Sequence, residues 1–146
     1  MRTMRPWIWI SLILAAVALS AGSVAAQEIT IALGSEPTTL DPQLREDGGE
    51  RAVNDNVYET LMARTPDGKL KPGLVASEPR LVDPKTWEVK LRSGIKFHNG
   101  EPFNADAVVY SVKRIIDKKF NSEQISFFST IVDAKKVDDL TLQIMT

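Results

Sequence analysis

The chain contains no cysteine and a single histidine, and it has no long apolar run after residue 26. Without cysteine there are no disulfides, so an exported form must be stabilised by an apolar core, which favours a globular domain over a small disulfide-rich one. A lipid anchor is also excluded, because it needs a cysteine at the cleavage point. Metal sites usually combine several histidine, cysteine or carboxylate ligands, so we expect no metal and no other cofactor.

Catalytic motifs are lacking as well: no serine stands in a nucleophile elbow, and there is no glycine-rich phosphate loop. We interpret His98, which precedes an Asn-Gly turn, as a structural residue. The carboxylates Glu46, Asp47 and Glu50 cluster in and after a glycine-bearing loop, either as an acid/base pair or as groups that are solvated or bind a cationic group of a ligand. Because no nucleophile or oxyanion motif accompanies them, we favour the second interpretation and predict that the chain is not an enzyme.

The first 26 residues have the three parts of an export signal. Arg2 and Arg5 make the start positive, Trp7–Leu19 is an apolar run broken only by Ser11, and Val24-Ala25-Ala26 is a small-residue cleavage site. The run is shorter than the ~20 apolar residues of a membrane-spanning helix, so an uncleaved anchor is the less favoured alternative. We therefore predict a cleaved signal peptide over residues 1–26 and a soluble periplasmic protein after it.

Removing the signal changes the charge balance. The whole chain has 18 basic and 19 acidic residues, and without Arg2 and Arg5 the balance is 16 to 19, a net charge near −3. Acidic and basic residues are interspersed, as on an ordinary solvated surface. Since a nucleic-acid partner calls for a basic face, we expect none.

Several patterns predict elements in the first half of the exported part. Alternating apolar residues predict a strand over Glu28–Leu33, and apolar residues at helical spacing predict a helix over about Glu50–Thr60. The segment between them, Thr38–Gly49, contains Asp-Pro and Gly-Gly and is expected to be a loop. Pro66-Asp67-Gly68-Lys69 is typical of a tight turn, so we predict a small hairpin around it.

The second half has the stronger patterns. Trp87 begins an alternation of apolar residues that we expect to be buried in a core, and Asn99-Gly100 predicts a two-residue hairpin turn. Asn104 suits the N-cap of a helix. An amphipathic stripe follows, with Lys113-Arg114 on its solvated side; the stripe residues are Ala105, Val108, Val109, Val112, Ile115 and Ile116.

Two further strands are predicted near the end, at Ile131–Lys135 and Leu140–Met145. The second is followed at once by Thr146, with no closing turn. We therefore expect a fragment of a longer protein, which by itself binds nothing tightly and is only partly stable.

Four sequence blocks occur in a recognisable order: SEPTTLDP over Ser35–Pro42, VYETLMARTPDGKLKPGLVASE over Val57–Glu78, WEVKLRSGIKFHNGEPFNADAVVYSVKR over Trp87–Arg114, and VDDLTLQI over Val137–Ile144. Together they resemble the family 5 solute-binding proteins of bacterial ABC importers, the peptide/nickel-binding group. The resemblance implies an α/β, periplasmic binding protein-like fold with two lobes and an extra subdomain, of which only the N-terminal part of the first lobe is present.

The same resemblance implies a domain division and a function. Residues 27–58 would open the ligand-binding lobe, and residues 59–146 would form an incomplete extra subdomain. The protein would be a monomer that captures an oligopeptide, a dipeptide or a similar small solute and delivers it to an inner-membrane ABC permease with its ATPase subunits. In peptide-binding relatives the stretch after Leu-Asp-Pro lines the cleft, so Arg45, Glu46 and Asp47 are the candidate ligand-binding residues.

Two alternatives remain open. One is a secreted hydrolase whose catalytic residues lie outside this sequence. The other is a sensing or chaperone role on the same scaffold. The ligand is open too, because relatives of this group take peptides, nickel complexes, opines and oligosaccharides.

Overall fold

The computed structural model describes residues 29–146, so the predicted signal peptide (1–26) lies outside the described residues. The chain divides into two units between Ala32 and Leu33, and the fold below is that of the second, Leu33–Thr146. Its elements, in chain order, are α2 (Gly48–Asn54), β1 (Met62–Arg64), β2 (Leu70–Pro72), β3 (Arg80–Asp83), β4 (Thr86–Lys90), α3 (Ala105–Ile116), the 3₁₀ helix η1 (Ile125–Phe128), β5 (Asp133–Asp138) and β6 (Thr141–Met145).

The strand predicted over Glu28–Leu33 is wrong for its described part, residues 29–33, which have no regular structure. Ile29 and Ile31 are 80% and 76% exposed. Apolar alternation marks a face that can be buried, but a strand also needs a neighbour for its backbone hydrogen bonds. No strand among the described residues supplies that neighbour.

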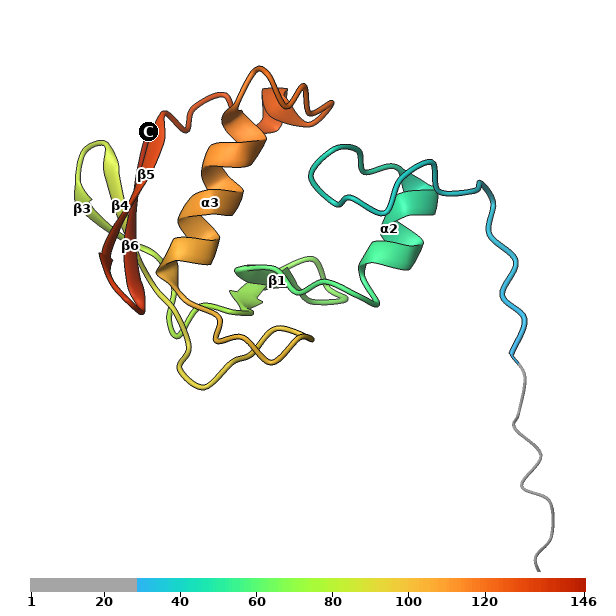
Figure 1. Cartoon of the computed structure of the whole chain (residues 1–146), viewed down its shortest axis with the longest axis horizontal. Coiled ribbons are helices and arrows are strands. Elements are labelled where there is room, and N and C mark those ends of the chain that lie inside the picture. The colour runs from blue at the N-terminus through green and yellow to red at the C-terminus, as the bar shows by residue number, and fades with distance from the viewer. Residues whose placement is uncertain (1–28) are drawn as a thin grey trace, which may run out of the picture. The chain divides into compact units, whose positions relative to one another are not determined.

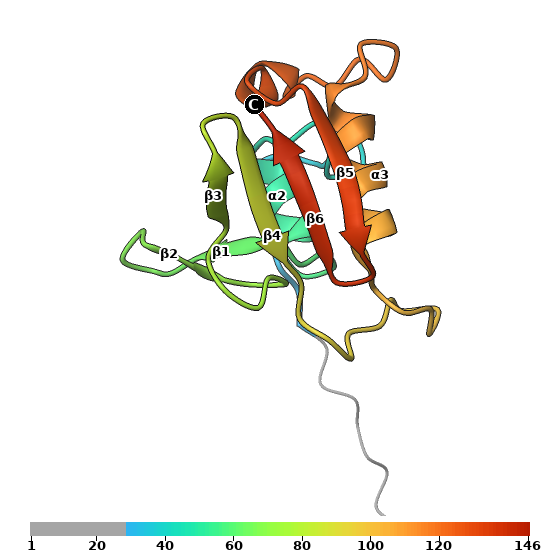
Figure 2. The ribbon, with the colours of Figure 1, turned by 90° about the vertical axis from the view of Figure 1, so that its left-hand side faces the viewer.

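A four-stranded antiparallel sheet, in the order β3-β4-β6-β5, forms one layer and α3 packs on one face of it. Figure 2 shows the sheet in front with α3 behind the β5 side. Both hairpins of the sheet turn at an aspartate: Asp83 Oδ1 accepts from Lys85 N, and Asp138 Oδ1 accepts from Leu140 N. Such side-chain-to-backbone bonds favour tight turns, so the chain reverses sharply at both places. The two strands predicted near the C-terminus are confirmed: β5 begins two residues later and ends three residues later than predicted, and β6 begins one residue later.

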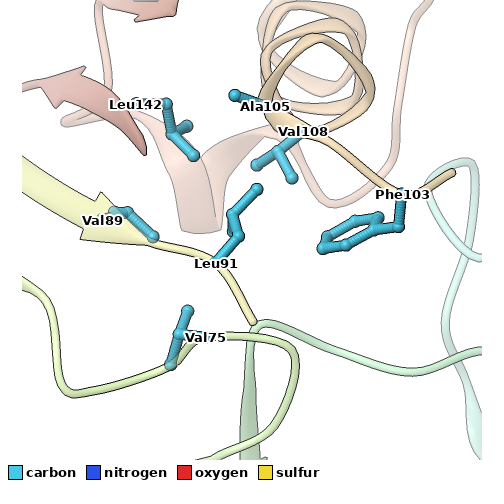
Figure 3. Close-up of a cluster of buried hydrophobic side chains, with 7 residues drawn as sticks. All are labelled: Val75, Val89, Leu91, Phe103, Ala105, Val108 and Leu142. Atoms are coloured by element: carbon cyan, nitrogen blue, oxygen red, sulfur yellow. The ribbon is translucent and has the colours of Figure 1, made fainter. Parts of the chain in front are cut away.

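The hydrophobic core lies between this sheet and α3. Val89 of β4 and Leu142 of β6 are cross-strand partners and point toward α3, where Ala105 and Val108 meet them (Figure 3). Leu91, just after β4, lies between the two layers. Seven residues make up the cluster: Val75, Val89, Leu91, Phe103, Ala105, Val108 and Leu142.

Helix α3 confirms the prediction from its amphipathic stripe. Asn104 is its N-cap, with an extended backbone and a side-chain oxygen 3.1 Å from Ala107 N. Ala105, Val108 and Ile115 of the stripe are buried. The cap satisfies one of the free N–H groups of the first turn, and the apolar face fixes the helix on the sheet.

Trp87 differs from the expectation of full burial, because 39% of its surface is exposed. It lies on β4 opposite Ile144 of β6, two residues before the buried Val89. Helix α3 packs mainly over β5, so the part of this face that belongs to β4 and β3 is less covered. Alternation predicted the face correctly, but not how far the helix extends over it.

Two turns were predicted from glycine-containing motifs. The first is confirmed: Pro66-Asp67-Gly68-Lys69 joins β1 to β2, and Gly68 has φ +83°. The second has three loop residues rather than two, because Phe97 N donates to Glu101 O and Gly100 N donates to Phe97 O. Asn99 keeps a negative φ while Gly100 has φ +88°, which is the three-residue hairpin with glycine in the left-handed position.

The helix predicted over about Glu50–Thr60 is found as α2, which is shorter and begins earlier. Its start is set by Asp47, whose Oδ1 accepts from Gly49 N at 2.8 Å and from Glu50 N at 3.4 Å. At its end, Asn54 O accepts from Val57 N and Tyr58 N, and the chain turns away. Capping therefore outweighed the apolar spacing that had placed the helix further along.

Candidate functional site

A groove of about 1430 Å³ lies within residues 33–146. Its walls are the loop before α2, the segment from Asp55 to Met62, the hairpin at 95–98 and the side of α3. Large apolar or aromatic side chains in it are partly exposed: Leu40, Val57, Tyr58, Phe97 and Tyr110. Pockets for single small molecules usually measure about 300–1,000 Å³, so this groove has room for a more extended ligand.

The loop Leu40–Asp47 borders the groove with Leu40, Asp41, Pro42, Gln43 and Glu46. Its turn is internally fixed, because Asp41 Oδ1 accepts from Gln43 N and Asp41 O accepts from Leu44 N. Tyr58 donates its hydroxyl to Leu40 O at 3.1 Å. The loop is therefore a defined structure, which a ligand-contacting segment requires.

Arg114 of α3 binds this loop. Its Nη1 donates to Asp41 Oδ1 at 3.0 Å and to Gln43 Oε1 at 2.9 Å, and its Nη2 donates to Asp41 Oδ2. The guanidinium also lies 3.8 Å from the centre of the Phe120 ring. The hydrogen bonds from Arg114 are the main cause that lowers the pKa of Asp41, while Asp41 raises the pKa of Arg114. Both groups thus stay charged at neutral pH.

This result corrects the expectation that Lys113-Arg114 belongs to the solvated side of the helix. Lys113 does, as its side chain is 53% exposed and pairs with Asp133 at 3.3 Å. The Arg114 side chain is only 29% exposed. Helical periodicity gives the direction of a side chain, but it does not show that another segment covers it.

A second set of contacts joins the same loop to the segment after α3. Ser122 Oγ donates to Gln43 O at 2.6 Å, Gln124 Nε2 donates to Pro42 O at 2.8 Å, and Glu123 N donates to Leu44 O at 3.0 Å. Ser122 and Gln124 are buried. Three consecutive loop carbonyls are therefore satisfied by residues about eighty positions further along the chain, a link that no local pattern reveals.

The structure places the three predicted ligand-binding residues side by side at the end of this loop, each with an internal partner. Arg45 lies 3.5 Å from Asp47 and 3.6 Å from Glu123. Glu46 pairs with Arg51 at 2.7 Å. Asp47 is the N-cap of α2. Glu46 is the one of the three that lines the groove, so their role as ligand contacts stays a prediction, with Glu46 in the best position for it.

Glu50, which the sequence groups with Glu46 and Asp47, is in a different environment. It is fully buried, and its Oε1 accepts from the N–H and the hydroxyl of Thr38, each at 2.8 Å. The hydrogen bonds that Thr38 donates to this carboxylate help to lower the pKa of Glu50 to about 2. Glu50 is therefore an ionised anchor for the segment before the loop rather than a solvated carboxylate.

Asn54 lies one helical turn after Glu50 on α2. Its side-chain amide and Glu50 Oε2 are buried without a hydrogen-bond partner among the described residues. Such groups are costly to bury. Neither residue lines the groove. The two side chains therefore form a small buried polar cluster beside the loop.

The described residues hold neither a metal-type cluster nor a membrane-type helix. Among residues 29–146, no three histidine, cysteine, aspartate or glutamate side chains gather as a metal site would require. Within the same residues, no helix has the length and apolar character needed to span a bilayer.

His98, the single histidine of the sequence, lines the groove from the tip of the hairpin at residues 97–101.

Residues 69–146 match the sequence profile of the bacterial extracellular solute-binding proteins, family 5, middle region. The chain belongs to this family. Its described part is a partial α/β piece of a periplasmic binding protein-like fold, as the solved structures below show.

Among curated proteins, the glutathione-binding protein GsiB of Escherichia coli K12 is 33% identical over 135 residues, which are 92% of this chain and 26% of that protein. GsiB of Shigella dysenteriae is 35% identical over 120 residues, 82% of this chain and 23% of that protein. The chain thus spans about a quarter of the length of the curated relatives it matches.

Solved structures agree. NikZ of Campylobacter jejuni, in complex with Ni(L-His), has a TM-score of 0.71 and 26% identity over 77% of this chain and 22% of that one. OppA of Haemophilus influenzae, in complex with the peptide RPPGFSPFR, has a TM-score of 0.70 and 27% identity over 77% and 25%. The E. coli murein tripeptide binding protein MppA has a TM-score of 0.68 and 27% identity over 75% and 25%.

Sequence reasoning identified the family and the loop, but it missed the groove residues Tyr58, Phe97 and Tyr110 and the role of Arg114. The aromatic residues are far apart in the sequence and share a wall only after the hairpin and α3 have packed. The sequence shows Asp41 in the Leu-Asp-Pro motif, but only the structure shows that this carboxylate is partly buried and therefore calls for a partner.

Proposed function

We propose that the chain is part of a periplasmic solute-binding protein of an ABC importer. Such a protein captures a short peptide or a peptide-like solute and delivers it to an inner-membrane permease with ATPase subunits. The observation that carries the proposal is the family match over residues 69–146. Further support comes from relatives whose names state what they bind: glutathione, a nonapeptide, a murein tripeptide and a nickel–histidine complex.

The proposal includes a domain division and a location. Residues 1–26 would be a cleaved signal peptide, residues 27–58 the start of the ligand-binding lobe and residues 59–146 part of an extra subdomain. The mature protein would work in the periplasm as a monomer without a lipid anchor or cofactor, and it would make and break no covalent bond. Capture would occur by closure of two lobes around the solute.

Glu46 is our choice for a direct ligand contact. Its carboxylate lines the groove, and its partner Arg51 is 61% exposed, so their ion pair contributes little to stability and can be exchanged for a bond to a solute. A carboxylate at this place would accept hydrogen bonds from an ammonium or backbone N–H group of a peptide. Arg45 and Asp47 would shape the loop around it.

Isothermal titration of the intact protein with glutathione, a mixed tripeptide pool and nickel–histidine tests the function. We expect saturable binding of at least one peptide probe. Absence of heat with all three would remove the proposal. Glu46→Gln then tests the contact: affinity for the bound probe should fall about tenfold, the loss of one charge-assisted hydrogen bond.

Arg51→Gln is the matched control for Glu46→Gln. It breaks the same ion pair from the other side and leaves the Glu46 carboxylate in place. We expect its affinity to be unchanged or higher. If both variants lose affinity equally, Glu46 acts through the ion pair rather than through the ligand.

A further inference from the structure

Arg114 makes the most heavily bonded ion pair of the described residues. It meets both carboxylate oxygens of Asp41 and, in addition, Gln43 Oε1, and it stacks on the Phe120 ring. A guanidinium has the planar fork of donors and the flat face that these partners require, whereas an ammonium offers one point charge. The site is therefore specific for arginine.

Burial separates this pair from the other ion pairs near the groove. The Arg114 and Asp41 side chains are each 29% exposed, whereas Arg51 is 61% and Lys113 is 53% exposed. Solvent screens exposed pairs and leaves them with little effect on structure. The Arg114–Asp41 pair is thus the one able to fix the position of a loop.

The Arg114–Asp41 ion pair is connected to Glu46, the proposed ligand contact, by hydrogen bonds within the turn of the loop. Asp41 Oδ1, which Arg114 holds, also accepts from Gln43 N, and Asp41 O accepts from Leu44 N. Glu46 follows Leu44 by two residues. Displacement of Asp41 therefore moves the turn and carries Glu46 with it.

We propose that Arg114 is a positioning residue for solute binding: it holds the loop Leu40–Asp47 on α3 so that Glu46 faces the groove. This inference rests on the function proposed above. Arg114 also lines the groove, but the role proposed here is exerted through the loop. The bonds from Ser122, Glu123 and Gln124 to the loop backbone remain without it, so its removal should loosen the loop and leave the fold intact.

The experiment compares Arg114→Gln, Arg114→Lys and the control Lys113→Gln in the intact protein. Lys113 is the neighbouring helix residue, and its partner Asp133 is outside the loop. The first readout needs no ligand: amide hydrogen exchange of peptides covering residues 40–47, with the peptide covering β4 as internal reference. The second is the affinity for glutathione or the peptide probe that the wild type binds.

For Arg114→Gln we expect exchange in the loop to rise about tenfold, and affinity to fall by a similar factor, with exchange in β4 unchanged. Arg114→Lys should lie between the wild type and Arg114→Gln, because it restores the charge without the fork. Lys113→Gln should change either readout less than about twofold. If Arg114→Gln is too unstable to purify, Arg114→Lys carries the same comparison.

Two results would overturn the proposal. Unchanged loop exchange in Arg114→Gln would show that the loop does not depend on this residue. Faster loop exchange with unchanged affinity would show that the held conformation does not matter for binding. A wild type that binds none of the probes would instead refute the proposed function, and with it the ligand half of this inference, while the exchange data would still decide whether Arg114 holds the loop.

Discussion

Two regions of this molecule are held by different kinds of interaction. Every buried apolar side chain among the described residues lies at or after Val75, in the sheet and α3 and the segments that join them. In residues 33–60 the buried positions are Gly49, Glu50 and Asn54. That region is attached by hydrogen bonds and an ion pair, chiefly from Arg114, Ser122 and Gln124.

The difference shows how stability and positioning are divided. Apolar burial is non-directional and supplies most of the folding free energy. Hydrogen bonds and forked ion pairs add less, but they fix geometry. A segment with few apolar contacts can also be moved at a low free-energy cost, which suits a loop that has to meet a ligand.

The largest effect is expected in the apolar region. Leu142 of β6 is completely buried between the sheet and α3, so Leu142→Ala should lower the free energy of unfolding by about 2–5 kcal/mol. Val137→Ala is the control in the neighbouring strand: Val137 is 55% exposed, and its loss should cost about 0.5 kcal/mol or less. Urea unfolding measures both. Equal losses would mean that the core is not where the structure puts it.

The next effect tests close packing in the polar region. A Cβ on Gly49 would lie 2.8 Å from Ser35 Oγ and 2.9 Å from Ser35 O, whereas one on Gly48 meets nothing within 4 Å. Gly49→Ala should therefore destabilise by about 1–3 kcal/mol. Gly48→Ala, in the same helix, should stabilise by about 0.5 kcal/mol. If thermal melting shows the same sign for both, the segment around Ser35 does not pack on α2.

A smaller effect concerns the start of α3, which joins the two regions. Asn104→Ala removes the side-chain acceptor for Ala107 N and should cost about 1 kcal/mol in urea unfolding. Asn104→Asp keeps an acceptor at the same place and should remain close to the wild type. An equal loss in the aspartate variant would contradict the capping role.

The last prediction concerns Glu50 and is measured as a change of stability with pH, because the contribution of this carboxylate is present at neutral pH and is lost in acid. The fold lowers the pKa of Glu50 from an ordinary 4.5 to about 2, so its contribution to stability is complete above pH 4.5 and is lost as the pH falls toward 2. Glu50→Gln cannot titrate, so its stability should fall less over this range. Asp41 adds a slope of the same sign in both proteins. Identical slopes in urea midpoints would refute the assignment.

Local patterns were sufficient at three places where near neighbours in the sequence decide the structure. Three predicted features depend only on residues that are close in the sequence, and all three are confirmed: the turn at Pro66–Lys69, the Asn104 cap and the apolar stripe of α3. The family resemblance is confirmed too. At Asn99-Gly100 the turn was predicted correctly, but the predicted length of two residues is wrong, since two competing loop lengths share that dipeptide.

Patterns failed where a distant segment decides. Ile29 and Ile31 alternate as a strand does, yet no described strand pairs with them. The exposure of Trp87 depends on where α3 lies. The helical pattern predicts a solvated Arg114, because it does not show that Asp41, 73 positions earlier, pairs with this residue.

The amino-acid order by itself thus determined the family, the hairpin at Pro66–Lys69 and the helix α3 with its cap, because these follow from backbone preferences and contacts between near neighbours. Only the tertiary structure decided that Arg114, Ser122 and Gln124 hold the loop and that Glu46 alone of its three candidates lines the groove. The physical reason is that hydrogen bonds are directional and short. Their partners become known only when the chain has brought remote residues within about 3 Å of each other.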